Sequence, residues 1–282
     1  MDAILLCMKK QGIRFFSRIK FTNTNIIRFH TKNNFLGLLR SRIDKYDNVL
    51  IMAHGSNDSI ITPTHDLNRK WEKYITESDA DAFSNNFVFA ISCLTANKFG
   101  GKCVEAGALC YLGYQVEISS LFSVKKLEKS YIPKRVVLHF DTIIKHIFIE
   151  ELSKAYEEFL TSPISVEVLK ERFAFLLEQR IAELPNLSPQ EYFEKYQIQL
   201  SDQNIKQFIS VVTLQVLSLL NDITPRLICI GDPNYISSTF ITYAKNDGLA
   251  SELITERLLN NPFYRLIENE EYKSFLLKKA KF

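Results

Sequence analysis

A histidine and a cysteine each follow an apolar run in this chain. His54 comes directly after residues 49–53, and Cys93 follows residues 87–91 with one serine between. An imidazole can activate a thiol by taking its proton, and the thiolate is a strong nucleophile. If the two runs are neighbouring parallel strands, their carboxyl ends bring both side chains to one substrate. The spacing therefore makes a cysteine–histidine dyad one hypothesis for these residues.

Each residue on its own also has a structural interpretation. A histidine after a strand can serve packing alone, and a free cysteine is among the most buried residue types. Gly55, next to His54, would let the backbone approach a ligand closely. The catalytic hypothesis rests on the pair together.

The elements that would position these residues alternate between strands and helices. The apolar pattern predicts strands over 4–8, 25–30, 49–53 and 87–91, with an amphipathic helix over 35–43. We expect 60–82 to be loop-like with a helix around Trp71, then a helix over 100–108 and a strand over 109–118. Near-continuous apolar strands separated by helices are typical of a parallel sheet covered on both faces. The predicted fold class is α/β, with three layers and a mostly parallel central sheet.

The character of the sequence changes at about residue 141. Apolar residues at helical spacing, several preceded by Ser or Thr as candidate N-caps, predict helices over 143–160, 165–184, 188–196 and 201–220. A short apolar strand at 226–230 then ends in Gly-Asp-Pro. We expect a domain over 1–240 that includes a helical insertion at about 143–222. Residues 241–282 would form a C-terminal helical extension.

Composition narrows the function class. The 282 residues are 46% apolar, enough for a large core, and 35 basic residues against 32 acidic ones are interspersed. No nucleic-acid partner is indicated. The most apolar later stretch, 208–220, is shorter than the roughly 20 residues that span a bilayer, and the amino-terminal run lacks the pattern of a secretory signal. Five cysteines without Cys-x-x-Cys spacing suggest a reducing cytoplasm and no metal or other cofactor.

Short motifs around the pair resemble the caspase-like (clan CD) cysteine peptidases, closest to the branch with separase, gingipains and bacterial CHAT domains. That branch shows a His-Gly pair, then Ala-Cys or Ser-Cys with a nearby Thr, and a Gly-Ala segment leading to Gly-Tyr. Here the matching residues are 54–55, 92–95, 107–108 and 112–114. Residues 159–169 resemble the two helices leading away from the active-site strands, and 226–233 are similar to the strand closing on Gly-Asp-Pro. The similarity covers about 25–240 through motifs in the right order.

The resemblance implies a caspase-like fold and a mechanism. Cys93 would attack the scissile carbonyl as a thiolate, and His54 would supply the proton to the leaving amine. The backbone N–H groups of Gly55 and Cys93 would form the oxyanion hole. The resemblance further implies a protein substrate, in some cases encoded by a neighbouring gene, and an upstream sensor or activator. Bacterial members often act in defence or regulated cell death.

The substrate pocket is less defined. Metacaspases carry an acidic residue two positions before the nucleophile, but Ile91 stands there, so the sequence does not support a preference for basic residues. Glu117 and Asp58 are the acidic candidates for the pocket. Glu117 can equally be a solvent-facing edge residue, and Asp58 a turn residue.

Two other functions stay open. The first is a catalytically inactive caspase-like scaffold or regulatory subunit, although both His54 and Cys93 stand in their motifs. The second is a nucleotide- or phosphate-binding protein that uses 97–101 as an anion loop, but the usual glycine spacings are absent. His30, His65, His139 and His146 are expected at element ends, loops or surfaces. Cys103 and Cys110, seven residues apart, are expected to pack in the core.

Overall fold

The computed structural model describes residues 2–7, 14–41, 48–63, 71–118, 134–196 and 203–282. Its centre is a six-stranded sheet in the order β2-β1-β3-β7-β8-β9. The strands are β1 (Ala3–Cys7), β2 (Ile26–Phe29), β3 (Asn48–Met52), β7 (Phe87–Ile91), β8 (Cys110–Tyr114) and β9 (Leu227–Gly231). All neighbours are parallel except β8 and β9. The α/β class and the mostly parallel sheet are therefore confirmed.

The inner strands are buried on both faces. Every residue of β1, β3, β7 and β8 is buried, which explains why their sequences are continuous apolar runs rather than alternating ones. The edge strand β2 keeps two exposed residues. Strand β8 ends at Tyr114, four residues earlier than predicted.

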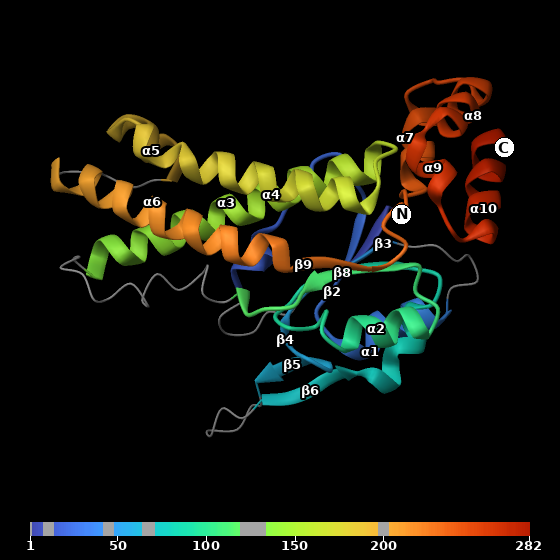
Figure 1. Ribbon diagram of the computed structural model, residues 1–282, viewed down its shortest axis with the longest axis horizontal. Helices are drawn as coiled ribbons and strands as arrows, with labels where there is room; N and C mark the ends of the chain where they lie inside the picture. The colour runs from blue at the N-terminus through green and yellow to red at the C-terminus, as the bar shows by residue number, and fades with distance from the viewer. Residues whose placement is uncertain (1, 8–13, 42–47, 64–70, 119–133, 197–202) are drawn as a thin grey trace.

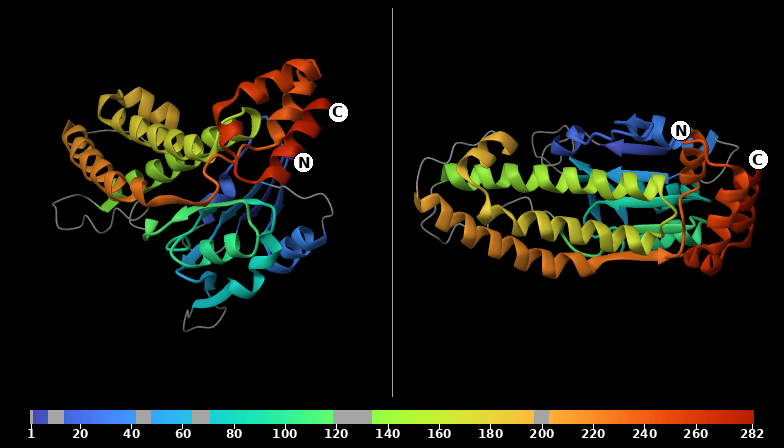
Figure 2. Two further views of the ribbon diagram at one scale, coloured as in Figure 1. Left: turned by 45° about the vertical axis from the view of Figure 1, so that its right-hand side comes forward. Right: turned by 90° about the horizontal axis from the view of Figure 1, so that it is seen from above.

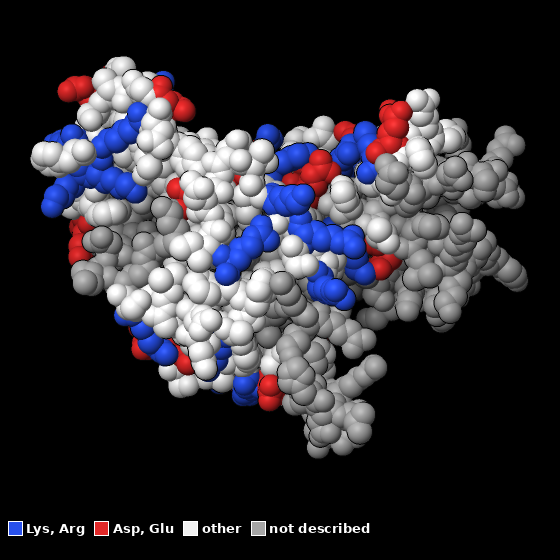
Figure 3. Space-filling model, turned by 180° about the vertical axis from the view of Figure 1, so that it is seen from behind, with Lys and Arg blue, Asp and Glu red and all other residues white. Residues whose placement is uncertain are grey.

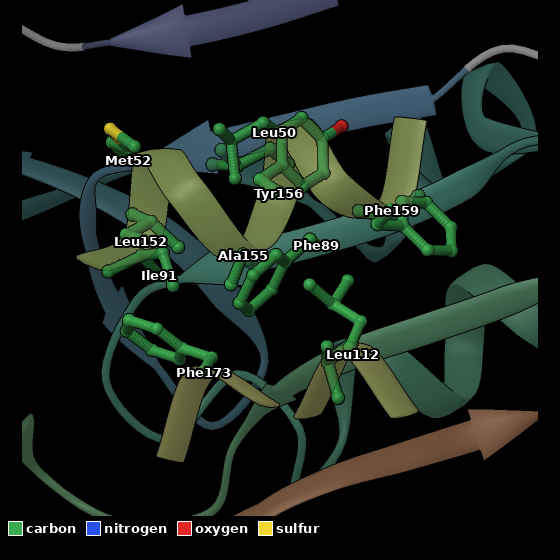
Figure 4. Packing of buried hydrophobic residues seen from close by; sticks show 14 of the residues in the cluster. Leu50, Met52, Phe89, Ile91, Leu112, Leu152, Ala155, Tyr156, Phe159 and Phe173 are labelled. Carbon is green, nitrogen blue, oxygen red and sulfur yellow. The ribbon is translucent and has the colours of Figure 1, made fainter. Parts of the chain in front are cut away.

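Helices cover the two faces of the sheet. Helices α1 (Lys32–Ser41) and α2 (Phe99–Glu105) lie on one face, and α3 (Lys134–Thr161) and α4 (Val166–Ala182) on the other (Figure 1). Figure 4 shows the core beneath the second pair. Side chains from α3 and α4 pack there against side chains of β3, β7 and β8. Labelled examples are Leu152, Tyr156, Phe159, Phe173, Leu50, Phe89 and Leu112.

The predicted helical insertion lies between β8 and β9 in the chain. After α4 come η5 (Leu184–Asn186), α5 (Pro189–Tyr196), α6 (Gln203–Ile223) and η6 (Thr224–Arg226). These helices extend past the sheet at the end where the parallel strands finish (Figure 2). Among the described helices, none is both long and apolar enough to cross a membrane.

Residues 60–63 and 71–76, from the segment predicted as a loop with a helix around Trp71, are instead strands of a second sheet. Strands β4 (His54–Ser56), β5 (Ser59–Pro63) and β6 (Trp71–Thr76) pair in antiparallel order, and η2 (Glu77–Phe83) follows. The prediction was wrong because the buried side of this small sheet is short, with Ile60, Thr62 and Ile75 on it. The polar residues of its other face conceal the alternation.

The C-terminal part is helical, as expected. It consists of α7 (Thr239–Asn246), α8 (Ser251–Asn260), α9 (Pro262–Leu266) and α10 (Glu270–Lys281). The predicted domain boundary at residue 240 falls inside α7. Tyr243 of that helix donates a hydrogen bond to the Asp2 carboxylate at 2.7 Å, which fastens α7 to the start of β1. Both chain ends lie at the same end of the molecule (Figure 2).

Candidate functional site

His54 and Cys93 lie at one edge of the central sheet. Strands β3 and β7 are adjacent and parallel, and their last register partners are Met52 and Ile91. Both His54 and Cys93 stand two residues beyond that pair. Because paired strands are about 4.8 Å apart, the two backbones leave the sheet side by side at its carboxyl edge. This is the edge where open α/β sheets bind ligands.

Beyond Met52 the chain turns out of the central sheet, and His54 is the first residue of the small sheet. It is half-buried and pairs with Ile61 of β5. The ring of Trp71, from β6, meets the imidazole in an edge-to-face contact with 4.6 Å between ring centroids and 67° between planes. The imidazole is thus held by the hairpin that sequence analysis took for a loop.

Cys93 is half-buried and begins a tight turn. The next residue, Leu94, has a φ of +62°, a left-handed conformation that is unusual for a leucine. Such a conformation costs on the order of 1–3 kcal/mol and is common at functional sites. Two backbone hydrogen bonds hold the cysteine turn in place. Leu94 N–H donates to Val116 O at 3.2 Å, and Ala96 N–H donates to Tyr114 O at 3.1 Å.

Gly55 packs directly against the cysteine turn. A Cβ atom on Gly55 would stand 2.3 Å from Ser92 Oγ, 2.4 Å from Cys93 O and 2.6 Å from Thr95 Cγ2. The sequence predicted that Gly55 allows close approach of a ligand. The structure gives it a second requirement, since only a residue without a Cβ lets the histidine strand lie this close to the cysteine turn.

Asn97 fastens the parts of the site together. Its Nδ2 donates to Asn57 Oδ1, in the turn after His54, and to Gln115 O, in the segment after β8, both at 3.0 Å. The N–H of Phe99 donates to Asn57 O at 2.9 Å. The histidine hairpin, the cysteine turn and the exit of β8 are therefore cross-linked by hydrogen bonds from one short loop.

Burial and charge distinguish the groups around the site. Burial raises the pKa of the Tyr114 phenol, and the nearby charge of Cys93 raises it further. Tyr114 is thus a neutral phenol close to the thiol. Burial also raises the pKa of Cys103 and, together with the contact with Cys229, that of Cys110. Cys7, Cys103 and Cys110 are buried, as expected for the last two, whereas Cys93 reaches the surface in part.

The two acidic pocket candidates are in different situations. Asp58 sits in the turn between β4 and β5, where its carboxylate accepts hydrogen bonds from Lys73, Ser56 and Ser59. The bond from Lys73 is the main cause that lowers the pKa of Asp58 to about 2. Glu117 is exposed and comes one residue after Val116, whose carbonyl oxygen accepts from Leu94. Glu117 thus lies close to the cysteine turn, while Asp58 is occupied within the hairpin.

Backbone N–H groups of the anion loop in the alternative hypothesis already donate within the protein. Besides Phe99, the N–H of Gly100 donates to Thr95 O at 2.8 Å. Lys98 forms an ion pair with Glu77 at 2.9 Å. These contacts leave few N–H groups and no unpaired Lys98 charge for a phosphate at 97–101.

The other histidines lie elsewhere. His30 Nδ1 is 2.7 Å from Cys7 O, and the exposed His146 lies 3.9 Å from Glu150. His65 and the side chain of His139 fall outside the described residues. Within the described part of the chain, no group of three His, Cys, Asp or Glu side chains is placed to hold a metal ion.

A separate groove lies between η1 (Arg14–Arg18) and α3. Its volume is about 1160 Å³, and basic side chains outnumber acidic ones along it; they include Arg14, Arg18, Lys20, Lys145 and Lys154. Figure 3 looks onto the rear of the molecule, where Lys and Arg side chains gather. The groove contains neither His54 nor Cys93, so it is distinct from the edge described above.

The chain matches no protein-family model and no curated protein. The sequence pattern did not indicate Trp71, Leu94 or Asn97 as parts of the sheet edge at His54 and Cys93. The one available signal was Trp71, a single tryptophan in a polar stretch.

Proposed function

We propose that this protein is a cysteine endopeptidase of the caspase-like type, with Cys93 as nucleophile and His54 as general base and acid. The observation that carries the proposal is the register of β3 and β7. The last register pair of these strands is Met52 and Ile91, and His54 and Cys93 each follow it by two positions. The strained turn at Leu94 and the close packing of Gly55 against Cys93 add support.

The proposed reaction follows from these two groups. His54 takes the proton of the Cys93 thiol, and the thiolate adds to the scissile carbonyl carbon. The C–N bond then breaks as the imidazolium returns its proton to the amine, which leaves a thioester on Cys93. Water, deprotonated by His54, hydrolyses the thioester and regenerates the thiol.

The oxyanion would be stabilised by the backbone N–H groups of Gly55 and Cys93. What supports this assignment is proximity, since a Cβ on Gly55 would be only 2.4 Å from Cys93 O. Glu117 remains the acidic candidate for a substrate contact at the cysteine turn, because it follows Val116, whose carbonyl oxygen accepts from Leu94. Asp58 is a weaker candidate, since its carboxylate already binds Lys73.

The substrate is proposed to be a protein, cleaved in the cytoplasm in bacterial defence or regulated cell death after an upstream sensor acts. We propose that the helical insertion helps the substrate to dock. Its position supports this role, because it projects beyond the sheet at the end where β3 and β7 lead to His54 and Cys93. The inactive scaffold is the alternative, and reactivity of the thiol separates the two.

The decisive test compares the reactivity of thiols in the intact protein. We expect iodoacetamide to alkylate Cys93 at least tenfold faster at pH 7 than Cys229, which is also half-buried, because His54 would favour the thiolate. His54→Ala should slow alkylation of Cys93, while His146→Ala, a change at an exposed histidine, should not. Peptide mapping by mass spectrometry gives both rates.

Cleavage of a peptide library derived from a bacterial proteome is the second measurement. Wild-type protein should generate new amino termini, and Cys93→Ala and His54→Ala should each abolish them while the circular dichroism spectrum is unchanged. If either variant cleaves at the wild-type rate, the mechanism is wrong. Equal alkylation of Cys93 and Cys229 would point instead to the inactive scaffold.

A further inference from the structure

The most exposed aromatic side chain near the candidate site is Trp71, which borders His54. It is the only tryptophan of the chain, and 53% of its surface is exposed. Leaving a large apolar surface in water forgoes about 25 cal/mol for each Å² that could be buried. An exposed aromatic ring beside a reactive pair is therefore a candidate for contact with a ligand.

The register of the small sheet explains how Trp71 reaches His54. His54 pairs with Ile61, and Trp71 pairs with Pro63, two residues further along β5. Residues two apart point to the same face of a strand, so His54, Ile61 and Trp71 share one face. A register shift between Ile60 and Ile61 keeps Lys73 opposite Ile61. On the opposite face, Ile60, Thr62 and Ile75 are buried.

The charge of Lys73 on this face is balanced by a carboxylate. Lys73 is the nearest cation in the register, and it is paired with the Asp58 carboxylate. Ile61 is half-buried and adds apolar surface between His54 and Trp71. Trp71 and Ile61 thus place apolar surface beside the imidazole on an otherwise polar face, and Lys73, the cation that the described strands place there, is paired with Asp58.

We propose that Trp71, with Ile61, forms the subsite for the substrate side chain next to the scissile bond, and that this side chain is aromatic or large and aliphatic. The inference rests on the proposed peptidase function, because it names the substrate class of the same site. In a hydrophobic binding site, one methylene more or less changes the rate by roughly 10- to 200-fold, so apolar contacts with Trp71 and Ile61 can discriminate among side chains.

The test uses four peptidyl acyloxymethyl ketones that differ only in the residue beside the ketone: Phe, Leu, Asp or Lys. Attack by a cysteine forms a thioether and expels the carboxylate, so intact mass spectrometry counts the modified chains. Each rate is divided by the iodoacetamide rate of the same variant, which removes differences in thiol reactivity. We expect the Phe and Leu probes to react with Cys93 at least tenfold faster than the Asp and Lys probes.

Three variants separate a binding role from a structural one. Trp71→Ala should bring the Phe-to-Asp ratio close to one, and Trp71→Phe should retain most of it. Phe193→Ala, at an aromatic residue that is exposed on α5, should keep the wild-type ratio. A wild-type ratio near one, or an unchanged ratio in Trp71→Ala, would overturn the subsite while leaving Cys93 as the nucleophile.

A binding measurement keeps the inference testable if Cys93 proves unreactive. In Cys93→Ala the fluorescence of the single tryptophan reports on the subsite directly. We expect Ac-Gly-Gly-Phe-Gly-Gly-amide to change this fluorescence at a concentration at least tenfold lower than the Asp analogue does. Equal responses to the two peptides would refute the subsite without reference to catalysis.

Discussion

A Cβ atom on Gly55 would lie 2.4 Å from the carbonyl oxygen of Cys93. The histidine strand and the cysteine turn are therefore in contact through their backbones, and the contact tolerates no side chain. Because Cys93 O belongs to the main chain, it cannot rotate away as the end of a flexible side chain could.

Gly55→Ala should accordingly destabilise the protein by about 1–3 kcal/mol, the usual cost of overpacking. It should also lower the rate of Cys93 alkylation, since one of the two segments must move. Urea unfolding gives the free energy. The matched control is Gly37→Ala, in the middle of α1, where nothing lies within 4 Å of the added atom. That change should stabilise by about 0.5–1 kcal/mol, and equal effects of both substitutions would contradict the packing argument.

Ser92 allows the same contact to be dissected. Its Oγ is buried, and within the described residues it makes no hydrogen bond. Ser92→Ala should therefore be neutral or stabilising, because it removes a buried polar group at little cost. Combined with Gly55→Ala it should restore only part of the lost stability, since the clash with Cys93 O remains. Full recovery in the double variant would show that the serine hydroxyl alone caused the damage.

Asn97→Ala should loosen the site more than it destabilises the fold. The change removes hydrogen bonds to Asn57 Oδ1 and Gln115 O, both on exposed segments, and we expect a loss of at most about 1 kcal/mol. The alkylation rate of Cys93 should fall several-fold. The control is Asn234→Ala, at a residue far from Cys93 in the sequence. It removes a hydrogen bond of 3.4 Å from Asn234 Nδ2 to Leu266 O and should leave the alkylation rate unchanged. A fall in stability without any change in the rate would rule out a positioning role for Asn97.

Stability should decrease in alkaline solution because buried thiols resist ionisation. Burial raises the pKa of Cys103 and Cys110 above the value near 8.5 of an unfolded cysteine. Above that pH the folded state holds more protons than the unfolded state, so the free energy of unfolding falls as pH rises. The expected slope is about 1.4 kcal/mol per pH unit for each thiol. Cys103→Ala should reduce the slope measured by urea unfolding between pH 8.5 and 9.5, and an unchanged slope would exclude Cys103 as a source of it.

The hairpin beside the site should respond to acid. The hydrogen bond from Lys73 is the main cause that lowers the pKa of Asp58 from its usual 3.8 to about 2. Its stabilisation is present above the unfolded value and is lost as pH falls from about 4 toward 2. Because Asp58 is largely at the surface, the effect should be local and modest. Trp71 fluorescence should follow it, and both Asp58→Asn and Lys73→Gln should remove the transition; its persistence in either variant would assign it to another group.

The sequence alone determined the strands that carry the candidate residues. The apolar runs that became β3 and β7 are continuous because both faces of those strands are buried, and that pattern is visible locally. The positions of His54 and Cys93 just after these runs were likewise readable without a structure. The helices of the insertion were predicted for a similar reason, since apolar residues recur at helical spacing.

Only the tertiary structure decided how these pieces meet. The adjacency of β3 and β7 is a pairing between segments almost forty residues apart in sequence, and no local pattern specifies it. The small sheet was missed because its strands are short and its outer face is polar. The left-handed Leu94 and the position of Trp71 beside His54 follow from that packing, because contacts distant in sequence impose both. The sequence thus placed a thiol and an imidazole at strand ends, and the fold brought those ends to one edge.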